Sequence, residues 1–326
     1  MHNRSFAAVS NAFLAPVKKV GAQQGFYNVP EEITRELVRR ERKDEIDLGD
    51  LGEVVVSLEP ALGRIESEAS AVVGRIVRSE SLSCMSSRDR AILAFFTTVQ
   101  FLRVPRQRDL FAQLTDALRD RIGAFVEEKG ADREAELERL GLGSVTPSTQ
   151  AHMHLAHVSR AYEYLPYFWS KTWFLHRAPA DAQLYIGDNP ITLWNHGPKG
   201  GSGIRGFGLG TLKSEIAMPL CPRLCLVMLC PSMIEESRAI LRTVDELRIN
   251  GRAVDASLTA PHQELLLAAE SGRPIDLPGD EATHFNWRQV YMASRYVCAS
   301  EGRFEVAHQT LAADPDTRSG PRIQIS

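Results

Sequence analysis

The stretch from Val54 to Val77 constrains the fold more than any other part of the chain, because its apolar residues recur at alternating intervals of four and three. This spacing places them on one face of an amphipathic α-helix. The apolar positions are Leu58, Leu62, Ile65, Ala69, Val72 and Ile76. A helix with one continuous apolar face has to bury that face against another element, so the sequence predicts a layered core around it.

A second helix is predicted to begin near Ser86 or Ser87, since serine is a favourable N-cap residue. Its inward positions are Ile92, Phe95, Phe96, Val99 and Leu102. Pro105 interrupts the pattern, which resumes between residues 110 and 122. The N-terminal part of the chain is therefore predicted to be an array of helices.

Strand-forming runs are bunched in the second half of the chain, after a connector at residues 127–147 and a helical region that begins near residue 148. The predicted strands are 183–187, 191–194, 216–220, 224–229 and 303–307. Residues 259–271 and 281–299 are expected to be helical. Bunched strands with helices before and after them favour an α+β fold over a regular βαβ alternation. We predict an N-terminal helical array packed with a small, mostly antiparallel sheet and C-terminal helices.

The expected domain organisation is a single domain over residues 1–326, a length that is sufficient to bury a large core. Within it we expect a helical lobe at about 30–130 and a sheet-containing lobe at about 148–310.

The charge and hydropathy of the chain exclude some partners. A formal net charge of -3 gives no overall attraction to nucleic acid or to anionic membranes. No apolar run approaches the roughly 20 residues of a membrane-spanning helix, so we expect a cytoplasmic protein with no membrane partner. The cysteines are odd in number, which favours reduced thiols. Cys221, Cys225 and Cys230 lie in an apolar run typical of a buried strand, and core packing is a better interpretation than a zinc site.

The run LYIGDNPITL at residues 184–193 is the first candidate site. A strand that ends at Asp188 and turns at Asn189 and Pro190 holds a carboxylate at a sheet edge, where loops often carry chemistry. A catalytic base or metal ligand is one interpretation of Asp188. A structural turn, in which the carboxylate accepts backbone N–H bonds, is the other.

A second candidate site lies on the first two helices. Arg103 falls within the apolar face of its helix, with Gln100 at the border, and an arginine directed at a core requires an anion. Glu59 and Glu66 lie two turns apart on the preceding helix, beside its apolar stripe. We therefore predict a polar cluster of these four residues, which serves either as a site or as an interhelical ion pair that only fixes packing.

Two further segments carry polar side chains. In the last long helix, Asn286, Gln289, Ala293 and Tyr296 share one face, which predicts either a packing network or a substrate-contact surface. Residues 195–210 formally match the dinucleotide fingerprint, but a strand follows where that fingerprint needs a helix, so we expect no nucleotide cofactor. Lys199 and Arg205 of this glycine-rich loop would place positive charge near Asp188 and bind an anionic substrate.

The spaced histidines His152, His154 and His157 do not predict a metal site. Only two of them share a helical face, and the usual helical zinc pair has a spacing of four with an intervening glutamate. Packed or exposed histidines are the better interpretation.

These pieces, in this order, resemble the largely bacterial family known as domain of unknown function 4238, over about Phe26 to Ser300. The segments that carry the resemblance are FY near residue 26, LEPALGRIESEA, SSRDRAILAFFTTVQFLRVPRQR, YIGDNPI, IAMPLCPRLCLVM and NWRQVYMASRYV. The resemblance implies that recurrent polar positions of the family correspond to the first-helix glutamates, Gln100, Arg103, Asp188 to Pro190 and Asn286. Members usually open with a segment of the type H-x-x-P-x-x-Y-L, and Met1 to Gln24 shows no such pattern.

Two functional hypotheses follow from the sequence. The first is an acid/base or metal-assisted hydrolase that acts on a phosphate-containing small molecule or nucleic acid. In it Asp188, Glu59, Glu66, Arg103, Gln100 and Asn189 form the catalytic set, Lys199, Arg205, Asn286 and Gln289 bind substrate, and a divalent metal is a candidate cofactor. The second is a non-enzymatic binding or effector protein, for instance in phage defence or stress response. A catalytic site requires Asp188 and the Glu/Arg cluster to meet in one cleft.

Overall fold

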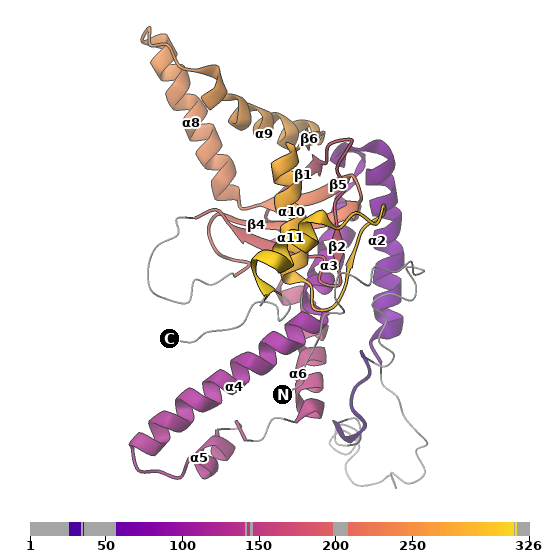
Figure 1. Cartoon of the computed structure of the whole chain (residues 1–326), viewed down its shortest axis with the longest axis vertical. Coiled ribbons are helices and arrows are strands. Elements are labelled where there is room, and N and C mark those ends of the chain that lie inside the picture. Colours follow the sequence, from indigo (N-terminus) through magenta and orange to yellow (C-terminus); the bar gives the residue numbers. More distant parts are fainter. Residues whose placement is uncertain are drawn as a thin grey trace.

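The computed structural model describes residues 26–33, 35, 57–140, 142–143, 146–197, 208–315 and 317 of the chain. It has the predicted α+β fold, with a central sheet and helices before and after it in sequence (Figure 1). The α-helices are α2 (Glu59–Ser79), α3 (Ser87–Leu102), α4 (Pro105–Glu128), α5 (Arg133–Arg139), α6 (Pro147–Ser159), α7 (Leu165–Trp169), α8 (Pro231–Ile249), α9 (Ala260–Ser271), α10 (Gly279–Met292) and α11 (Glu305–Ala313). The strands are β1 (Thr172–Arg177), β2 (Ile186–Gly187), β3 (Thr192–Asn195), β4 (Ser214–Cys221), β5 (Leu224–Leu229), β6 (Pro274–Asp276) and β7 (Val297–Cys298).

The main sheet has five strands in the order β3-β4-β5-β1-β6. All of its pairs are antiparallel except β1 with β6. The pair β4 and β5 is a hairpin that places Ile216 opposite Met228 and Ala217 opposite Val227. A second sheet has two strands, β2 and β7. This pairing is one of the contacts between residues 183–190 and the C-terminal part of the chain.

Helices cover both faces of the main sheet, which explains the continuous apolar run of β5. One face packs against α2, α3 and α7. The buried residues of this cluster include Val72, Ile76, Leu93 and Phe168 from the helices and Trp173, Ile216 and Met228 from the strands. The other face packs against α8, α9 and α10 through Ile234, Ala268 and Phe285. The first of these clusters therefore joins the N-terminal helices directly to the sheet.

The N-terminal helices follow the sequence prediction closely. Ser86 caps α3 in a capping box with Asp89, so each side chain accepts the other's backbone N–H. Pro105 separates α3 from α4 because a proline has no N–H to continue the preceding helix and suits the first turn of the next one. The apolar stripe of α2 buries Leu62, Ala69, Val72 and Ile76, as its spacing predicted.

Three expectations about secondary structure were wrong. The helical region was expected to run through Phe174, whereas residues 172–177 form strand β1 beside the central strand β5, because pairing with β5 and β6 overrides the local aromatic pattern. Residues 303–307 were expected to form a strand and instead begin α11. The helix expected over 281–299 ends at Met292, where Ala293 turns to extended backbone and β7 follows.

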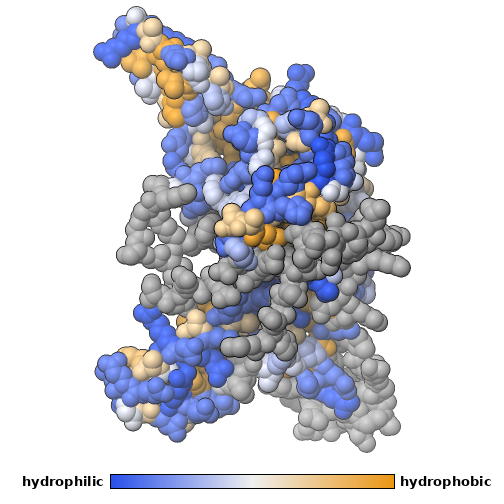
Figure 2. Space-filling model, in the orientation of Figure 1, coloured by the Kyte–Doolittle hydropathy of each residue, from blue (hydrophilic) through white to orange (hydrophobic). Residues whose placement is uncertain are grey.

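Two pairs of helices project from the body of the molecule, α4 with α5 at one end and α8 with α9 at the other (Figure 1). Both carry exposed apolar side chains, among them Phe125 on α4 and Ile249 at the end of α8. Figure 2 shows apolar side chains gathered along the α8–α9 projection. In the part of the chain that the structure describes, no helix has the combination of length and hydropathy that crossing a bilayer requires.

Candidate functional site

The structure places Asp188 directly after β2, with its carboxylate directed at the segment that follows α10. Its two oxygens accept the N–H groups of Ser294 at 2.8 Å and Tyr296 at 3.1 Å, while its own N–H donates to the Tyr296 carbonyl at 3.0 Å. Burial raises the pKa of the Asp188 carboxyl, although the backbone N–H donors oppose that effect. These bonds also explain why α10 ends early, because the N–H groups they use cannot continue a helix.

The amide side chains of α10 bond to the same strand region. Asn286 accepts the Tyr185 N–H at 2.7 Å and donates to the Gln183 carbonyl at 2.7 Å. Gln289 accepts the Gly187 N–H at 2.8 Å and donates to the Pro190 carbonyl at 2.9 Å. Both side chains therefore replace missing sheet partners of residues 183–190.

Gly187 is required by this close approach. A Cβ atom at this position would lie 3.2 Å from the Gln289 carbonyl oxygen and 3.4 Å from the Ala293 side chain. Asn189 is 1% exposed and donates to the Met292 carbonyl at 3.4 Å, while its buried Oδ1 has no hydrogen-bond partner among the described residues. The region around Asp188 is thus a tightly packed junction.

The Glu/Arg cluster lies elsewhere, on the seam of α2 and α3. Arg103 pairs with Glu66 at 2.5 Å, as its helical phase predicted. Glu59 is exposed at the first turn of α2, and within the described residues it forms no ion pair with Arg103; its charge acts on Tyr27, whose hydroxyl bonds the Arg103 carbonyl. Gln100 is half-buried, and its Oε1 atom has no hydrogen-bond partner among the described residues.

Residues near position 26 complete this cluster. The Tyr27 hydroxyl donates to the Arg103 carbonyl at 3.2 Å, and the Arg108 guanidinium stacks on the Phe26 ring and donates to its carbonyl at 2.9 Å. Burial raises the pKa of Tyr27. His154 is fully buried beside them and bonds the Leu102 carbonyl through Nε2 at 2.9 Å. The cluster anchors the segment around Phe26 to α3, α4 and α6.

The two predicted halves of the catalytic set are held by different partners, the segment after α10 for Asp188 and Glu66 of α2 for Arg103. Within the described ranges, no hydrogen bond or ion pair links Asp188 to Arg103, Glu66 or Gln100. Lys199, Arg205 and the segment Met1 to Gln24 lie outside the described residues, as does most of the glycine-rich loop.

The sequence analysis missed a buried charged network in the centre of the molecule. Glu215 of β4 forms an ion pair with Arg288 of α10 and accepts a hydrogen bond from His196 Nε2 at 2.8 Å. Arg288 also donates to the Thr192 carbonyl at 3.3 Å. Burial opposes the charge of Glu215, but Arg288 and His196 together lower the pKa of the Glu215 carboxyl to about 2. The pair is therefore ionised at neutral pH.

Several buried polar atoms at this network lack partners among the described residues. They are Arg288 Nε, Thr192 Oγ1 and both ring nitrogens of His176. Burial lowers the pKa of His176 to about 4, so its ring is neutral. Unpaired buried polar atoms are rare in folded proteins and concentrate at functional sites.

The outer face of α10 carries a continuous row of rings beside this network. His284 stacks on Trp287 with centroids 5.6 Å apart, Trp287 stacks on Tyr291 at 5.3 Å, and Trp194 of β3 meets His284 edge-on at 4.7 Å. Burial and the charge of Arg288 lower the pKa of His284, which keeps its ring neutral for stacking. We call His284, Trp287 and Tyr291 the α10 platform.

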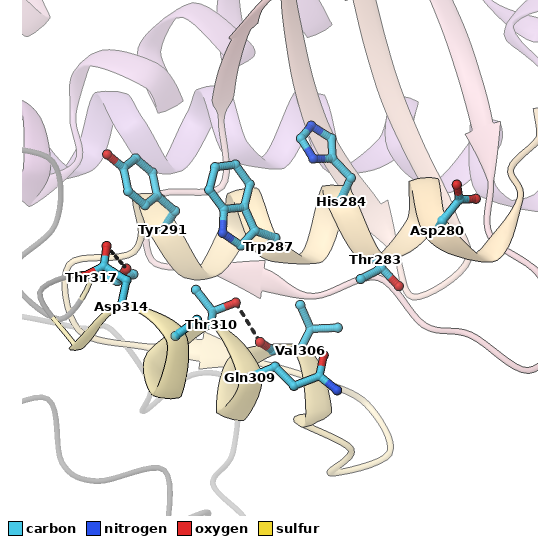
Figure 3. A pocket seen from close by; sticks show the side chains of 11 residues that line it. Asp280, Thr283, His284, Trp287, Tyr291, Val306, Gln309, Thr310, Asp314 and Thr317 are labelled. Carbon is cyan, nitrogen blue, oxygen red and sulfur yellow. Dashed lines mark hydrogen bonds between the residues drawn. The ribbon is translucent and has the colours of Figure 1, made fainter.

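The α10 platform lines an open groove of about 560 Å³ between α10 and α11. Figure 3 shows the three rings together on one side of α10, with Gln309 and Thr310 of α11 on the other side of the helix in this view. This volume lies within the range of roughly 300–1,000 Å³ that is usual for small-molecule sites. The groove is thus large enough for one small ligand.

Sequence signals for these features existed. Glu215 is a single carboxylate within an apolar strand, the same kind of signal that identified Arg103, and residues 284, 287 and 291 recur at helical spacing. Among the residues described, no group of three or more histidine, cysteine, aspartate or glutamate side chains has a geometry that would hold a metal ion.

Comparison with known proteins gives one match. The chain belongs to the family described as protein of unknown function (DUF4238), whose model matches residues 7–303. No curated protein and no solved structure is significantly similar to the chain.

Proposed function

We propose that this member of the family is a ligand-binding protein that holds a planar ring in the groove between α10 and α11. The observation that carries the proposal is the α10 platform, whose successive rings present one stacked aromatic surface to an open groove. Aromatic surfaces of this kind bind flat, conjugated ligands by stacking, a mode that tolerates many ring types.

The charges of the groove favour an uncharged or cationic ligand. The described residues that line it include the carboxylates Asp280 and Asp314 and contain no lysine or arginine. Glu281 adds a third carboxyl at this end of α10. A polyphosphate would be repelled by these groups, so the groove supports a ring without anionic substituents.

A hydrolase with Asp188 as its base has less support from the geometry. Both oxygens of Asp188 already accept backbone N–H groups, and among the described residues neither oxygen is paired with an arginine or lysine. These contacts favour the structural interpretation of Asp188, in which the carboxylate fixes the turn after α10.

The proposal is tested by titrating the full chain with coumarin, an uncharged bicyclic ring, and with coumarin-3-carboxylate, its anionic analogue, by calorimetry. We expect coumarin to bind and the carboxylate to bind more weakly. Tyr291→Ala should weaken coumarin binding about 3- to 10-fold, since one aromatic contact contributes about 0.5–1.5 kcal/mol.

The matched control is Tyr162→Ala, which removes a tyrosine that is 64% exposed and remote from the groove. It should leave binding unchanged. Equal losses in both variants, or no detectable binding by the wild-type chain, would contradict the proposal.

A further inference from the structure

His196 has the geometry of an oriented acid–base group. Its Nε2 atom lies 2.8 Å from the buried Glu215 carboxylate, and its side chain is 39% exposed. A histidine that donates Nε2–H to a carboxylate carries its lone pair on Nδ1, which is then free to accept a proton. In the described part of the chain, the bond to Glu215 is the only hydrogen bond of the His196 ring.

Glu215 is held so that it fixes this tautomer. The ion pair with Arg288 occupies one of its oxygens and leaves the other for His196. Because Arg288 is itself buried and bonded to the Thr192 carbonyl, neither partner is free to rotate away. A buried carboxylate that orients an exposed imidazole is a recurrent arrangement for general-base catalysis.

This pair lies beside the α10 platform. His196 follows two residues after Trp194, whose ring meets His284 at 4.7 Å and Trp287 at 6.0 Å. Burial lowers the pKa of His284, and Arg288, Glu215 and His196 lie near enough to affect it as well. The acid–base group and the stacking surface therefore belong to one region of the molecule.

We infer that His196 is a general base that activates water to hydrolyse an uncharged ester whose ring is stacked on the α10 platform. This inference rests on the proposed ligand-binding function. Nδ1 of His196 takes a proton from water as the water oxygen bonds to the acyl carbon. The bond from that carbon to the alcohol oxygen then breaks, the leaving alcohol takes the proton from His196, and a carboxylic acid and an alcohol are released. Glu215 stays ionised throughout and is a positioning residue.

The test uses two esters of one planar ring, 4-methylumbelliferyl acetate and 4-methylumbelliferyl phosphate, with the full chain. The wild-type chain should hydrolyse the acetate above the spontaneous rate and leave the phosphate intact. His196→Ala should lower kcat/KM for the acetate at least about 100-fold, in line with the loss of a general base. Added imidazole should restore part of this activity, which a merely structural role of His196 would not explain.

His308→Ala is the matched control, since it removes an exposed histidine of α11 that does not line the groove. Trp287→Ala should raise KM more than it lowers kcat, because it removes ring binding and leaves His196 in place. Hydrolysis that is unchanged in His196→Ala, hydrolysis of the phosphate alone, or coumarin binding without any esterase activity would each overturn the inference. Failure of coumarin binding itself would instead overturn the proposed function.

Discussion

Two of the arginine–glutamate pairs that join helices to their neighbours differ in their surroundings. In the pair of α2 and α3, the side chain of Arg103 is 15% exposed and that of Glu66 is 49% exposed. In the pair of α10 and β4, the corresponding values for Arg288 and Glu215 are 3% and 8%. The first pair is still partly in contact with solvent, whereas the second pair is buried in the protein interior. The difference shows that a similar contact distance carries a different energetic consequence when the solvent is removed.

The largest effect should come from breaking the buried pair on one side only. Arg288→Met leaves the Glu215 carboxylate buried without its cation, and we expect it to lower the free energy of unfolding by about 3–5 kcal/mol. Urea denaturation followed by tryptophan fluorescence measures this. The control Arg103→Met should cost about 1 kcal/mol or less beyond its lost packing. Similar losses in the two variants would remove the distinction between the pairs.

A double variant sharpens the same comparison. Arg288→Met combined with Glu215→Leu removes both buried charges, and should recover most of the stability that Arg288→Met loses, since well-packed apolar residues replace buried ion pairs at little cost. A double variant as unstable as the single one would show that packing, and not the stranded charge, causes the loss.

Mild acid should destabilise the regions of both pairs, and in the region of the first pair the cause is His154. Burial lowers the pKa of His154 to about 4, whereas the unfolded residue titrates near 6.5. Between these values the unfolded chain binds the proton and the folded chain does not, so stability is complete above pH 6.5 and falls as the pH falls toward 4. His154→Gln should reduce this fall by about 2–3 kcal/mol.

The pKa of His176 is also lowered to about 4, so its contribution is lost over the same pH range and part of the acid sensitivity should persist in His154→Gln. Glu215 stabilises the fold over a different pH range, because its folded-state pKa of about 2 lies below the unfolded value of 4.5. This stabilisation is lost only as the pH falls from about 4.5 toward 2. Denaturation midpoints measured from pH 7 to pH 3 separate these contributions. A variant with the wild-type slope between pH 6.5 and 4 would contradict the assignment to His154.

Asp188→Asn should have a smaller effect and lower the free energy of unfolding by about 1–2 kcal/mol at neutral pH. The amide oxygen still accepts one backbone N–H, but the amide NH2 group faces the second N–H and cannot accept from it. Burial raises the pKa of Asp188, so the folded state binds its proton at a higher pH than the unfolded state. Wild-type stability should therefore gain on the variant as the pH falls through the raised pKa toward the unfolded value of about 3.8, and the gain is lost as the pH rises through the raised pKa. Paired urea titrations at several pH values check this sign.

The smallest effect is expected for Glu66→Gln. Its carboxylate is half-exposed, so the variant should lose only about 0.2–1 kcal/mol, and added salt should reduce the difference. A loss as large as that of Arg288→Met would mean that the seam of α2 and α3 behaves as a buried site. Thermal unfolding at low and high salt measures the effect.

The sequence predicted best what depends on local periodicity. The stripe of α2, the Ser86 cap, the break at Pro105 and the strand Leu224–Leu229 all follow from residues within one element. Residues 172–177 were misassigned because their partners in β5 and β6 are distant in sequence, so no local pattern specifies the strand.

The same limit applies to the candidate sites. Arg103 was found because its position contradicts the apolar face of a single helix. The groove between α10 and α11 and the bond from Glu215 to His196 require the third dimension, because each joins residues that are distant in sequence. Asp188 was placed correctly at the end of a strand, but its partners, 106 and 108 residues later, decide that its oxygens are occupied.

The attachment of residues 183–190 to α10 has a consequence for folding during translation. The N–H of Tyr185 is bonded to a side chain 101 residues further along the chain. At a synthesis rate of roughly 5–20 residues per second, that partner emerges about 5–20 s later. When Tyr185 is synthesised, only β1 of the main sheet has been made, and β3, β4, β5 and β6 follow during this interval. The apolar segment around the ring of Tyr185 therefore waits for Val290 and Ala307, its final neighbours, while the sheet forms. The rate of translation sets how long this segment stays uncovered.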